Sequence, residues 1–226
     1  MKYGLTEIPM DPAPAPLLTL EQAKLHLRVD HSAEDSLIID QVLAATRIAE
    51  QYTRRAFVER AYRMTLDAFP RAGCVGSHAP QDGQVWPPRF GNLSVATRYP
   101  DAIVLPLGPL LTVTAIAYDS NDMDEDGQPI EDSVSAYRAS NAQWPPRITP
   151  RAGECWPCTA DVMDAVRIDF VAGYGAPGDV PQDIKAAVKL ILGSLHEHRE
   201  DELIGSATQL PRGAEALLSP YRIFRV

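Results

Sequence analysis

Proline limits where this chain can be helical. Its 226 residues include 20 prolines, and four of these, Pro9, Pro12, Pro14 and Pro16, fall in one short stretch near the start. Each proline lacks a backbone N–H and biases the residue before it toward extended backbone. Residues 1–18 are therefore predicted to form an extended arm.

Three other stretches carry the apolar spacing of amphipathic helices. Thr19 and Gln22 have the spacing of a capping box at the start of the first helix, and Pro181 suits the first turn of the last helix. The predicted helices span residues 19–29, 32–55 and 181–198. We expect them to pack together in a helical body made of residues 19–60 and 179–202.

Between these helices the spacing changes to that of strands. Tyr62, Met64 and Leu66 alternate with polar residues, which predicts a strand with these three side chains on one face. Further strands are predicted at residues 102–105, 111–118, 136–139, 147–149 and 165–171. Residues 61–178 are thus predicted to form an inserted β region.

Two long connections interrupt the β region, and a tail follows the last helix. Residues 70–101 hold no periodic pattern and are predicted to form a long loop, and residues 119–132 an acidic turn. Residues 203–226 are predicted to be an extended tail with one apolar turn. The order of elements predicts an α+β fold, in which a small, mostly antiparallel sheet is inserted between an N-terminal helix pair and a C-terminal helix.

Charge and composition exclude some classes of protein. The formal net charge of −9 argues against a protein that coats nucleic acid by neutralising phosphates. Three cysteines fit a reduced compartment better than a disulfide scaffold. No apolar run approaches the ~20 residues of a membrane helix, and the first residues do not read as a signal peptide, so we expect a soluble cytosolic protein without a membrane partner.

Cys155 and Cys158 have the spacing of a dithiol redox motif, and Cys74 with His78 would complete a zinc set. The residues after Cys158 lead toward a strand, whereas the redox motif needs a helix N-terminus. The two halves of the zinc set also lie about eighty residues apart. A metal-binding or redox enzyme therefore stays only as an alternative, and we expect no catalytic, metal or cofactor site.

The acidic turn matches the start of a calcium loop at residues 122–127 but has Ser133 where the bidentate Glu is needed. A hairpin tip is the better interpretation, although whether Asp122–Asp126 binds a cation stays open. Seven acids and no bases lie between Asp119 and Asp132, which predicts a local negative surface. His196 and His198 lie two apart, so they point to different sides of a helix and do not form a metal pair.

A second alternative is a nucleic-acid-binding accessory protein. Its contacts would come from a group of arginines near the end of the second helix, namely Arg54, Arg55, Arg60 and Arg63. Tight, salt-sensitive binding of DNA by the isolated protein would favour it.

The sequence also contains a series of short phrases in a specific order and spacing. The opening phrase runs from Leu18 to Asp30 and continues through Glu34-Asp35 into a helix that ends in Tyr52-Thr53-Arg54-Arg55. Later phrases follow in the same order: Leu66–Pro70, Leu105-Pro106, Pro109-Leu110, Val113–Ile116, Trp156-Pro157, Phe170–Gly175, Val180-Pro181, Glu197–Glu200 and Leu210–Arg222. In their order these phrases resemble tailed-phage head-tail connector, or adaptor, proteins. The stretch 71–101 and the acidic turn look longer than in that family.

The resemblance implies a structural virion protein that is not an enzyme and needs no cofactor. It implies a ring, probably of twelve copies, which docks beneath the portal protein at the capsid–tail junction. The ring would join the portal to a tail-side connector or tail terminator protein, and DNA would pass through its centre without sequence-specific binding. The protein would be made in the host bacterial cytoplasm.

Two candidate surfaces follow from this expectation. A ring needs a heterologous interface between unlike faces of neighbouring subunits. The candidate residues for it are Leu37, Ile48, Tyr52, Val188, Leu192 and Leu195. The tail carries much apolar and basic surface for a free end, so we expect it to bind the portal by folding on it. Its candidate residues are Arg212, Leu217, Leu218, Tyr221, Arg222, Ile223, Phe224 and Arg225.

Overall fold

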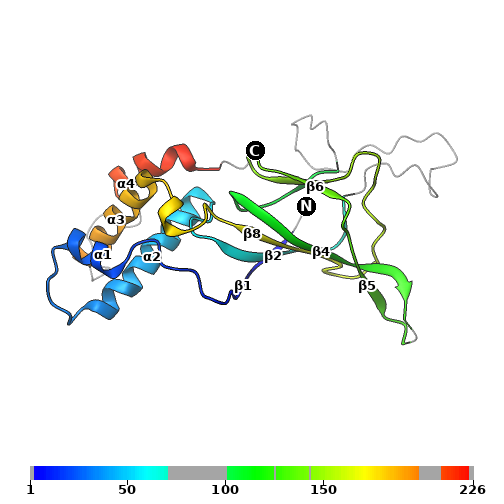
Figure 1. Ribbon diagram of the computed structural model, residues 1–226, viewed down its shortest axis with the longest axis horizontal. Coiled ribbons are helices and arrows are strands. Elements are labelled where there is room, and N and C mark those ends of the chain that lie inside the picture. The colour runs from blue at the N-terminus through cyan, green and yellow to red at the C-terminus, as the bar shows by residue number, and fades with distance from the viewer. Residues whose placement is uncertain (1–2, 71–100, 125, 143, 199–209, 224–226) are drawn as a thin grey trace.

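The computed structural model describes residues 3–70, 101–124, 126–142, 144–198 and 210–223. Helices gather at one end of an elongated molecule and strands at the other (Figure 1). The predicted α+β class is confirmed. The predicted long loop at 70–101 lies almost entirely outside the described residues.

The three predicted helices are present. They are α1 (Leu20–Leu27), α2 (Asp35–Thr53) and α3 (Gln182–Glu197). The predicted capping box starts α1: the Gln22 backbone N–H donates to Thr19 Oγ1 at 3.2 Å, and the Thr19 N–H donates to Gln22 Oε1 at 3.3 Å. Helix α2 begins later than predicted, because Glu34 precedes it without capping it through a side-chain hydrogen bond.

A fourth helix corrects the expectation of an extended tail. Helix α4 (Arg212–Leu218) continues into a short 3₁₀ turn, η2 (Ser219–Tyr221), and packs against α3. Ala214 and Leu218 of α4 are fully buried in the helical core. Seven residues are too few to show a helical period in the sequence, and the apolar face is covered by another helix. Residues 203–209 lie outside the described residues.

Every described strand pairs antiparallel with its neighbours. The larger sheet has the order β1-β2-β8-β4-β5, and the smaller has the order β3-β7-β6. The strands are β1 (Gly4–Ile8), β2 (Arg60–Leu66), β3 (Ile103–Val104), β4 (Leu110–Met123), β5 (Pro129–Ser133), β6 (Tyr137–Ser140), β7 (Arg147–Pro150) and β8 (Val166–Ala172). This confirms the predicted small antiparallel sheet, which the structure divides in two.

Two predicted irregular segments turn out to contain strands. The arm includes β1, which pairs with β2 at one edge of the larger sheet. The acidic turn is mostly a hairpin, because β4 continues to Met123 and β5 returns from Pro129. The side chains of β1, of β5 and of the last residues of β4 are mainly exposed. These segments therefore lack the alternation of buried and exposed side chains that indicates a strand.

The molecule has two buried clusters. The first joins the four helices and includes Leu18, Ile38, Ile184 and Leu218. The second fills the β region, where the alternation predicted for β2 holds and the Tyr62 ring stacks on Phe170 at 5.8 Å between centroids. The helical end and the β end thus each have a core.

A buried ion pair and a close backbone crossing join the two ends. Glu50 of α2 accepts from Arg60 Nη1 of β2 at 2.8 Å and from the Phe57 backbone N–H at 2.9 Å. Gly173 follows β8 with φ +141°, and a Cβ there would lie 2.6 Å from the backbone of Val58 and Glu59. Only glycine fits this crossing without strain.

Candidate assembly surfaces

The predicted interface residues on the helices divide into two groups. Val188 and Leu192 are fully buried within the chain's own core, so in this conformation they cannot contact a neighbouring subunit. Ile48, Tyr52 and Leu195 are partly buried and pack against the same core. The interface prediction was wrong for Val188 and Leu192, because the apolar face of α3 packs into the chain's own core.

Of the predicted interface residues, Leu37 keeps the largest exposed fraction. Its side chain on α2 is 38% exposed. Ile39 and Leu43 on the same helix are 46% and 50% exposed, and sequence reasoning did not single them out. The signal was present, because the run Leu37-Ile38-Ile39 is more apolar than one buried helix face requires. Exposed aliphatic side chains four residues apart lie on one side of a helix and can meet a partner.

The C-terminal segment is fixed to the end of α2. The Tyr221 carbonyl accepts from Arg55 Nε at 2.6 Å, and the Ile223 N–H donates to the Thr53 carbonyl at 3.0 Å. The Arg222 guanidinium lies 4.8 Å from the centroid of the Tyr52 ring. Residues 210–223 are thus folded on their own chain in this structure, and the expected binding of this segment to the portal stays a prediction.

The candidate tail residues differ in what they can still offer a partner. Arg212 and Arg222 are exposed, Leu217 and Tyr221 are half-buried, and Leu218 belongs to the core. Phe224 and Arg225 lie outside the described residues. The exposed side chains of this segment thus include the two arginines and the carboxylate of Glu215, whereas its large apolar side chains are at least half-buried.

Arg55 is the centre of this arrangement. Besides Tyr221, its guanidinium donates to the Tyr174 hydroxyl at 3.3 Å and lies 4.0 Å from the centroid of the Trp144 ring. The Trp144 ring in turn lies directly over Gly108, where any side chain would collide with it. The C-terminal segment, the turn after β8 and the loop before β7 therefore meet at one buried side chain.

The arginines considered for nucleic-acid binding mostly have partners within the chain. Arg60 is paired with Glu50, and Arg63 donates to both carboxylate oxygens of Asp169 at 2.7 and 2.8 Å. The hydrogen bond to Asp169 raises the pKa of Arg63 above its ordinary value. Arg54 and Arg63 are the exposed members of the group, and the charge of Arg63 is already paired with Asp169, which does not favour a phosphate-binding surface.

Cys155 and Cys158 flank a buried tryptophan but are themselves exposed. Cys155 and Cys158 are exposed, whereas Trp156 between them is 6% exposed and stacks on Phe69 at 4.8 Å. The Trp156 indole N–H donates to the Asp101 carbonyl at 2.7 Å. Cys74 and His78 lie outside the described residues, and among those described no three His, Cys, Asp or Glu side chains are placed to hold a metal.

The acidic hairpin uses several of its carboxylates internally. Arg167 bridges Asp119 at 2.7 Å and Glu131 at 3.0 Å. The Asp124 carboxylate accepts two backbone N–H groups within the turn, so it closes the hairpin tip. This tip lies at the end of the molecule away from the helices (Figure 1).

Tyr118 and Asp132 form a polar pair at the base of this hairpin. The Tyr118 hydroxyl donates to Asp132 at 2.9 Å. Burial, helped by the hydrogen bond to Asp132, raises the pKa of Tyr118 to about 12. The hydrogen bond from the Ser133 backbone N–H lowers the pKa of Asp132, and that from Tyr118 lowers it further. This carboxylate is therefore charged over the whole neutral range.

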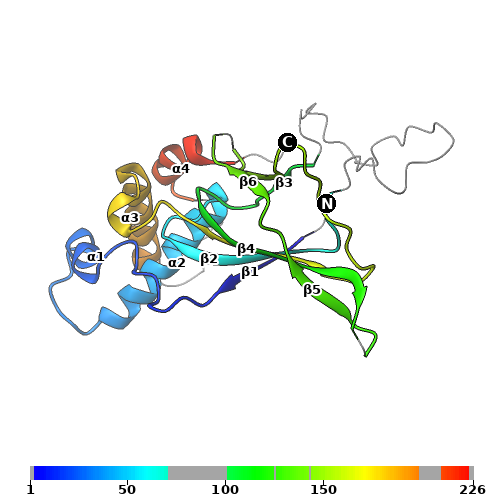
Figure 2. The same ribbon diagram turned by 45° about the vertical axis from the view of Figure 1, so that its right-hand side comes forward.

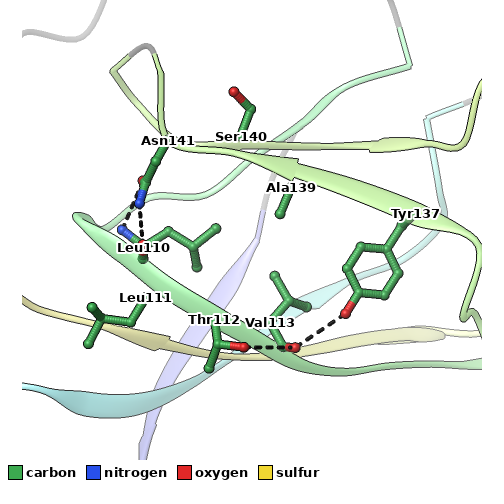
Figure 3. A pocket seen from close by; sticks show the side chains of 8 residues that line it. All are labelled: Leu110, Leu111, Thr112, Val113, Tyr137, Ala139, Ser140 and Asn141. Carbon is green, nitrogen blue, oxygen red and sulfur yellow. Dashed lines mark hydrogen bonds between the residues drawn. The ribbon is translucent and has the colours of Figure 1, made fainter.

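A shallow pocket lies between strand β6 and the part of β4 that pairs with β8 but not with β5 (Figure 3). Figure 2 shows β6 above this part of β4. At one end the Asn141 side chain accepts from the Leu110 N–H at 3.1 Å and donates to the Leu110 carbonyl. At the other end the Tyr137 hydroxyl donates to the Val113 carbonyl at 3.2 Å. No carboxylate, imidazole or thiol lines this pocket, so its contacts hold the two sheets together and offer no acid–base pair.

None of the described helices is long and apolar enough to cross a membrane. No curated protein sequence matches the chain significantly.

Comparison with known proteins finds one family match over part of the chain and structural matches over nearly all of it. The family model for phage gp6-like head-tail connector proteins matches residues 17–108. A chain in the neck of an empty GTA particle is 25% identical, with a TM-score of 0.70 over 99% of this chain and 97% of that one. A chain of the virion of a native gene transfer agent particle is also 25% identical, with a TM-score of 0.68 over 98% and 96%. A third, in the neck of the native particle, shares the fold at 24% identity and a TM-score of 0.64, over 99% of this chain and 97% of that one. The family match over residues 17–108 and the fold shared over nearly the whole chain support a structural head-tail connector.

Proposed function

We propose that the connector acts as a ring of twelve copies beneath a portal protein in a virion. The ring joins the portal to a tail-side connector or terminator, and DNA passes through its centre. The observation that carries the proposal is the full-length likeness to a chain in the neck of GTA particles. The neck of the native particle, which holds a chain of the same fold, was computed with C12 symmetry. The protein acts here without catalysis or a cofactor.

The side of α2 that bears Ile39 and Leu43 supplies one half of the seam between subunits. Both aliphatic side chains are about half exposed, and in a ring each subunit presents this side to a different face of its neighbour. Burying the exposed half of each side chain stabilises the contact by roughly 0.7–1.5 kcal/mol, about half the value for a fully exposed aliphatic side chain. Repeated at every seam, this supports a closed ring.

The C-terminal segment faces the portal in its folded form. Helix α4 and η2 are docked on α2 and α3, which leaves Arg212 and Arg222 exposed. Their charges suit an acidic surface, and a docked segment loses less conformational entropy on binding than a free tail would. The net charge of −9 helps DNA to slide through the ring rather than adhere to it.

The test is the mass of the assembled protein, measured by native mass spectrometry alone and after mixing with the portal from the same genome. A twelvefold species in either sample supports the proposal, and a monomer in both contradicts it. Leu43→Asp should abolish the ring while leaving the monomer folded, as judged by its circular dichroism. The exposed Gln51 on the same helix supplies the matched control, and Gln51→Asp should assemble normally.

A further inference from the structure

Strand β1 is attached to the molecule by few contacts. It pairs with β2 over five residues, from Gly4 opposite Thr65 to Ile8 opposite Ala61. Four of its five residues are exposed, and none belongs to either buried cluster. The contacts that hold β1 would therefore be the same whether the strand came from this chain or from another copy.

Two arginines make the edge of β2 selective for a strand with one carboxylate. Glu7 accepts from Arg47 of α2 at 2.7 Å and lies 3.7 Å from Arg60 of β2. Arg60 is already paired with the buried Glu50, which fixes the geometry of the site. An incoming strand in the right register places its carboxylate between the two guanidinium groups, and a strand shifted by one residue turns it to the opposite face.

The connection between β1 and the helices is suited to span a subunit boundary. Residues 9–16 contain four prolines and are irregular, and all of them except Met10 are exposed. Proline-rich segments behave as semi-rigid extended spacers of about 3.1 Å per residue, so these eight residues cover about 25 Å. Because this stiff, exposed connection forms few contacts, exchanging the attached strand between copies breaks few contacts and costs little free energy.

The surface next to the β1 site indicates which strand would occupy the position beside β2. Ile39 and Leu43 lie one turn apart on α2, and Arg47, which binds Glu7, lies one turn further along the same side. Both aliphatic side chains are uncovered in the single chain. A neighbouring subunit that inserted its strand beside β2 would reach Arg47 and cover this apolar stripe at the same time.

We propose that β1 is exchanged around the ring, so that each subunit places its own β1 on the β2 edge of the next copy. The inference rests on the proposed ring and adds the identity of one of its contacts. Each copy gives one strand and receives one, which is a heterologous contact that closes without leaving a free edge on β2. In the isolated chain β1 folds back on its own β2, as the structure shows.

Paired cysteines distinguish the two arrangements. In a background with Cys74, Cys155 and Cys158 changed to Ser, the test variant carries Ile8→Cys and Ala61→Cys, which face each other between β1 and β2. The control carries Ala61→Cys and Val171→Cys, which face each other between β2 and β8 within one chain. Facing residues have Cβ atoms about 4.5–5.5 Å apart, within reach of the short dithiol reagent dibromobimane.

The assembled rings are treated with this reagent and then separated on a denaturing gel. We expect the test variant to give a covalent ladder of dimers and higher species, and the control to give only internally linked monomers. Internally linked monomers from the test variant in an intact ring would overturn the exchange and leave the ring proposal standing.

Two further measurements cover failure of the double variant. If it does not assemble, single Ile8→Cys and Ala61→Cys chains are mixed before assembly. Linked dimers then support the exchange, and their absence in an intact ring overturns it. If the unaltered protein forms no ring with or without the portal, native mass spectrometry shows this directly, and both proposals fall.

Discussion

Replacing Gly173 by alanine tests whether the backbone crossing between the two ends of the molecule holds the fold together. The new Cβ would lie 2.6 Å from the Val58 carbonyl oxygen and from the Glu59 nitrogen. These atoms cannot move aside easily, because the Glu59 N–H donates to the Gly175 carbonyl and the Gly173 N–H to the Pro109 carbonyl. The change therefore forces either strain at residue 173 or a shift of neighbouring backbone.

The expected cost has two parts. A backbone conformation that side chains rarely adopt costs about 1–3 kcal/mol, and the geometry at Gly173, with φ +141°, is of this kind. Overpacking a site that cannot expand costs a further 1–3 kcal/mol or so. Gly173→Ala should thus lower the free energy of unfolding by about 4 kcal/mol. For a chain of this size that corresponds to a fall in Tm of roughly 8–16 °C.

Alanine substitutions at two other glycines measure the conformational contribution separately from the steric contribution. Gly127 has φ +75° with open space around it, so Gly127→Ala should cost only ~1 kcal/mol. Gly178 has neither a positive φ nor a close neighbour, so Gly178→Ala should change stability by less than about 0.5 kcal/mol. Urea unfolding followed by circular dichroism measures all three. If Gly173→Ala costs no more than Gly127→Ala, the steric reasoning is refuted.

Three further predictions concern the core, the ion pair and the hairpin. Leu218→Ala should cost about 2–5 kcal/mol in urea unfolding because it opens a cavity between α4 and α3, and the half-buried Leu217→Ala should cost clearly less; equal costs would contradict the burial of α4. Glu50→Gln should cost about 3 kcal/mol in the same assay because it removes the nearer and more buried of the two carboxylates beside the buried Arg60 guanidinium, and a neutral effect would count against the ion pair. Tyr118 has a raised pKa in the folded state, so the stability it contributes is complete below pH 10 and is lost as the pH rises toward about 12. In a spectrophotometric titration Asp132→Asn should lower the pKa of Tyr118 but leave it above 10, because burial remains; no change would show that the hydrogen bond does not contribute.

The sequence predicts those elements that carry their own local signal. The capping box of α1 and the alternation of β2 depend only on neighbouring residues, and both occur where they were expected. Helix α4 and strand β1 escape prediction because their partners, α3 and β2, lie far away in the sequence. For short elements of this kind, the tertiary partner rather than local periodicity determines the structure.

The assembly surfaces were less predictable than the fold for a related reason. An apolar residue on a helix has the same sequence signal whether it faces the chain's own core or another subunit. The sequence pattern therefore assigns Val188 and Leu192 to the interface although they are buried in the core, and it does not single out Ile39 and Leu43, which are exposed and which we propose for the seam. Only the packing of α2 against α3 and α4 separates the two groups.

The two buried clusters are completed at different times during synthesis. The β cluster draws its residues from Ala56 to Ala172, whereas the helical cluster needs residues from Leu17 to Leu218. Arg55 binds a carbonyl 166 residues further along the chain, which is a contact of very long range. Because a chain emerges from the ribosome from its N-terminus, the β end can close first and the helical end must wait for the final residues. A chain cut short before α4 therefore lacks a finished helical core, and with it the firm support for the surfaces proposed here to assemble the ring.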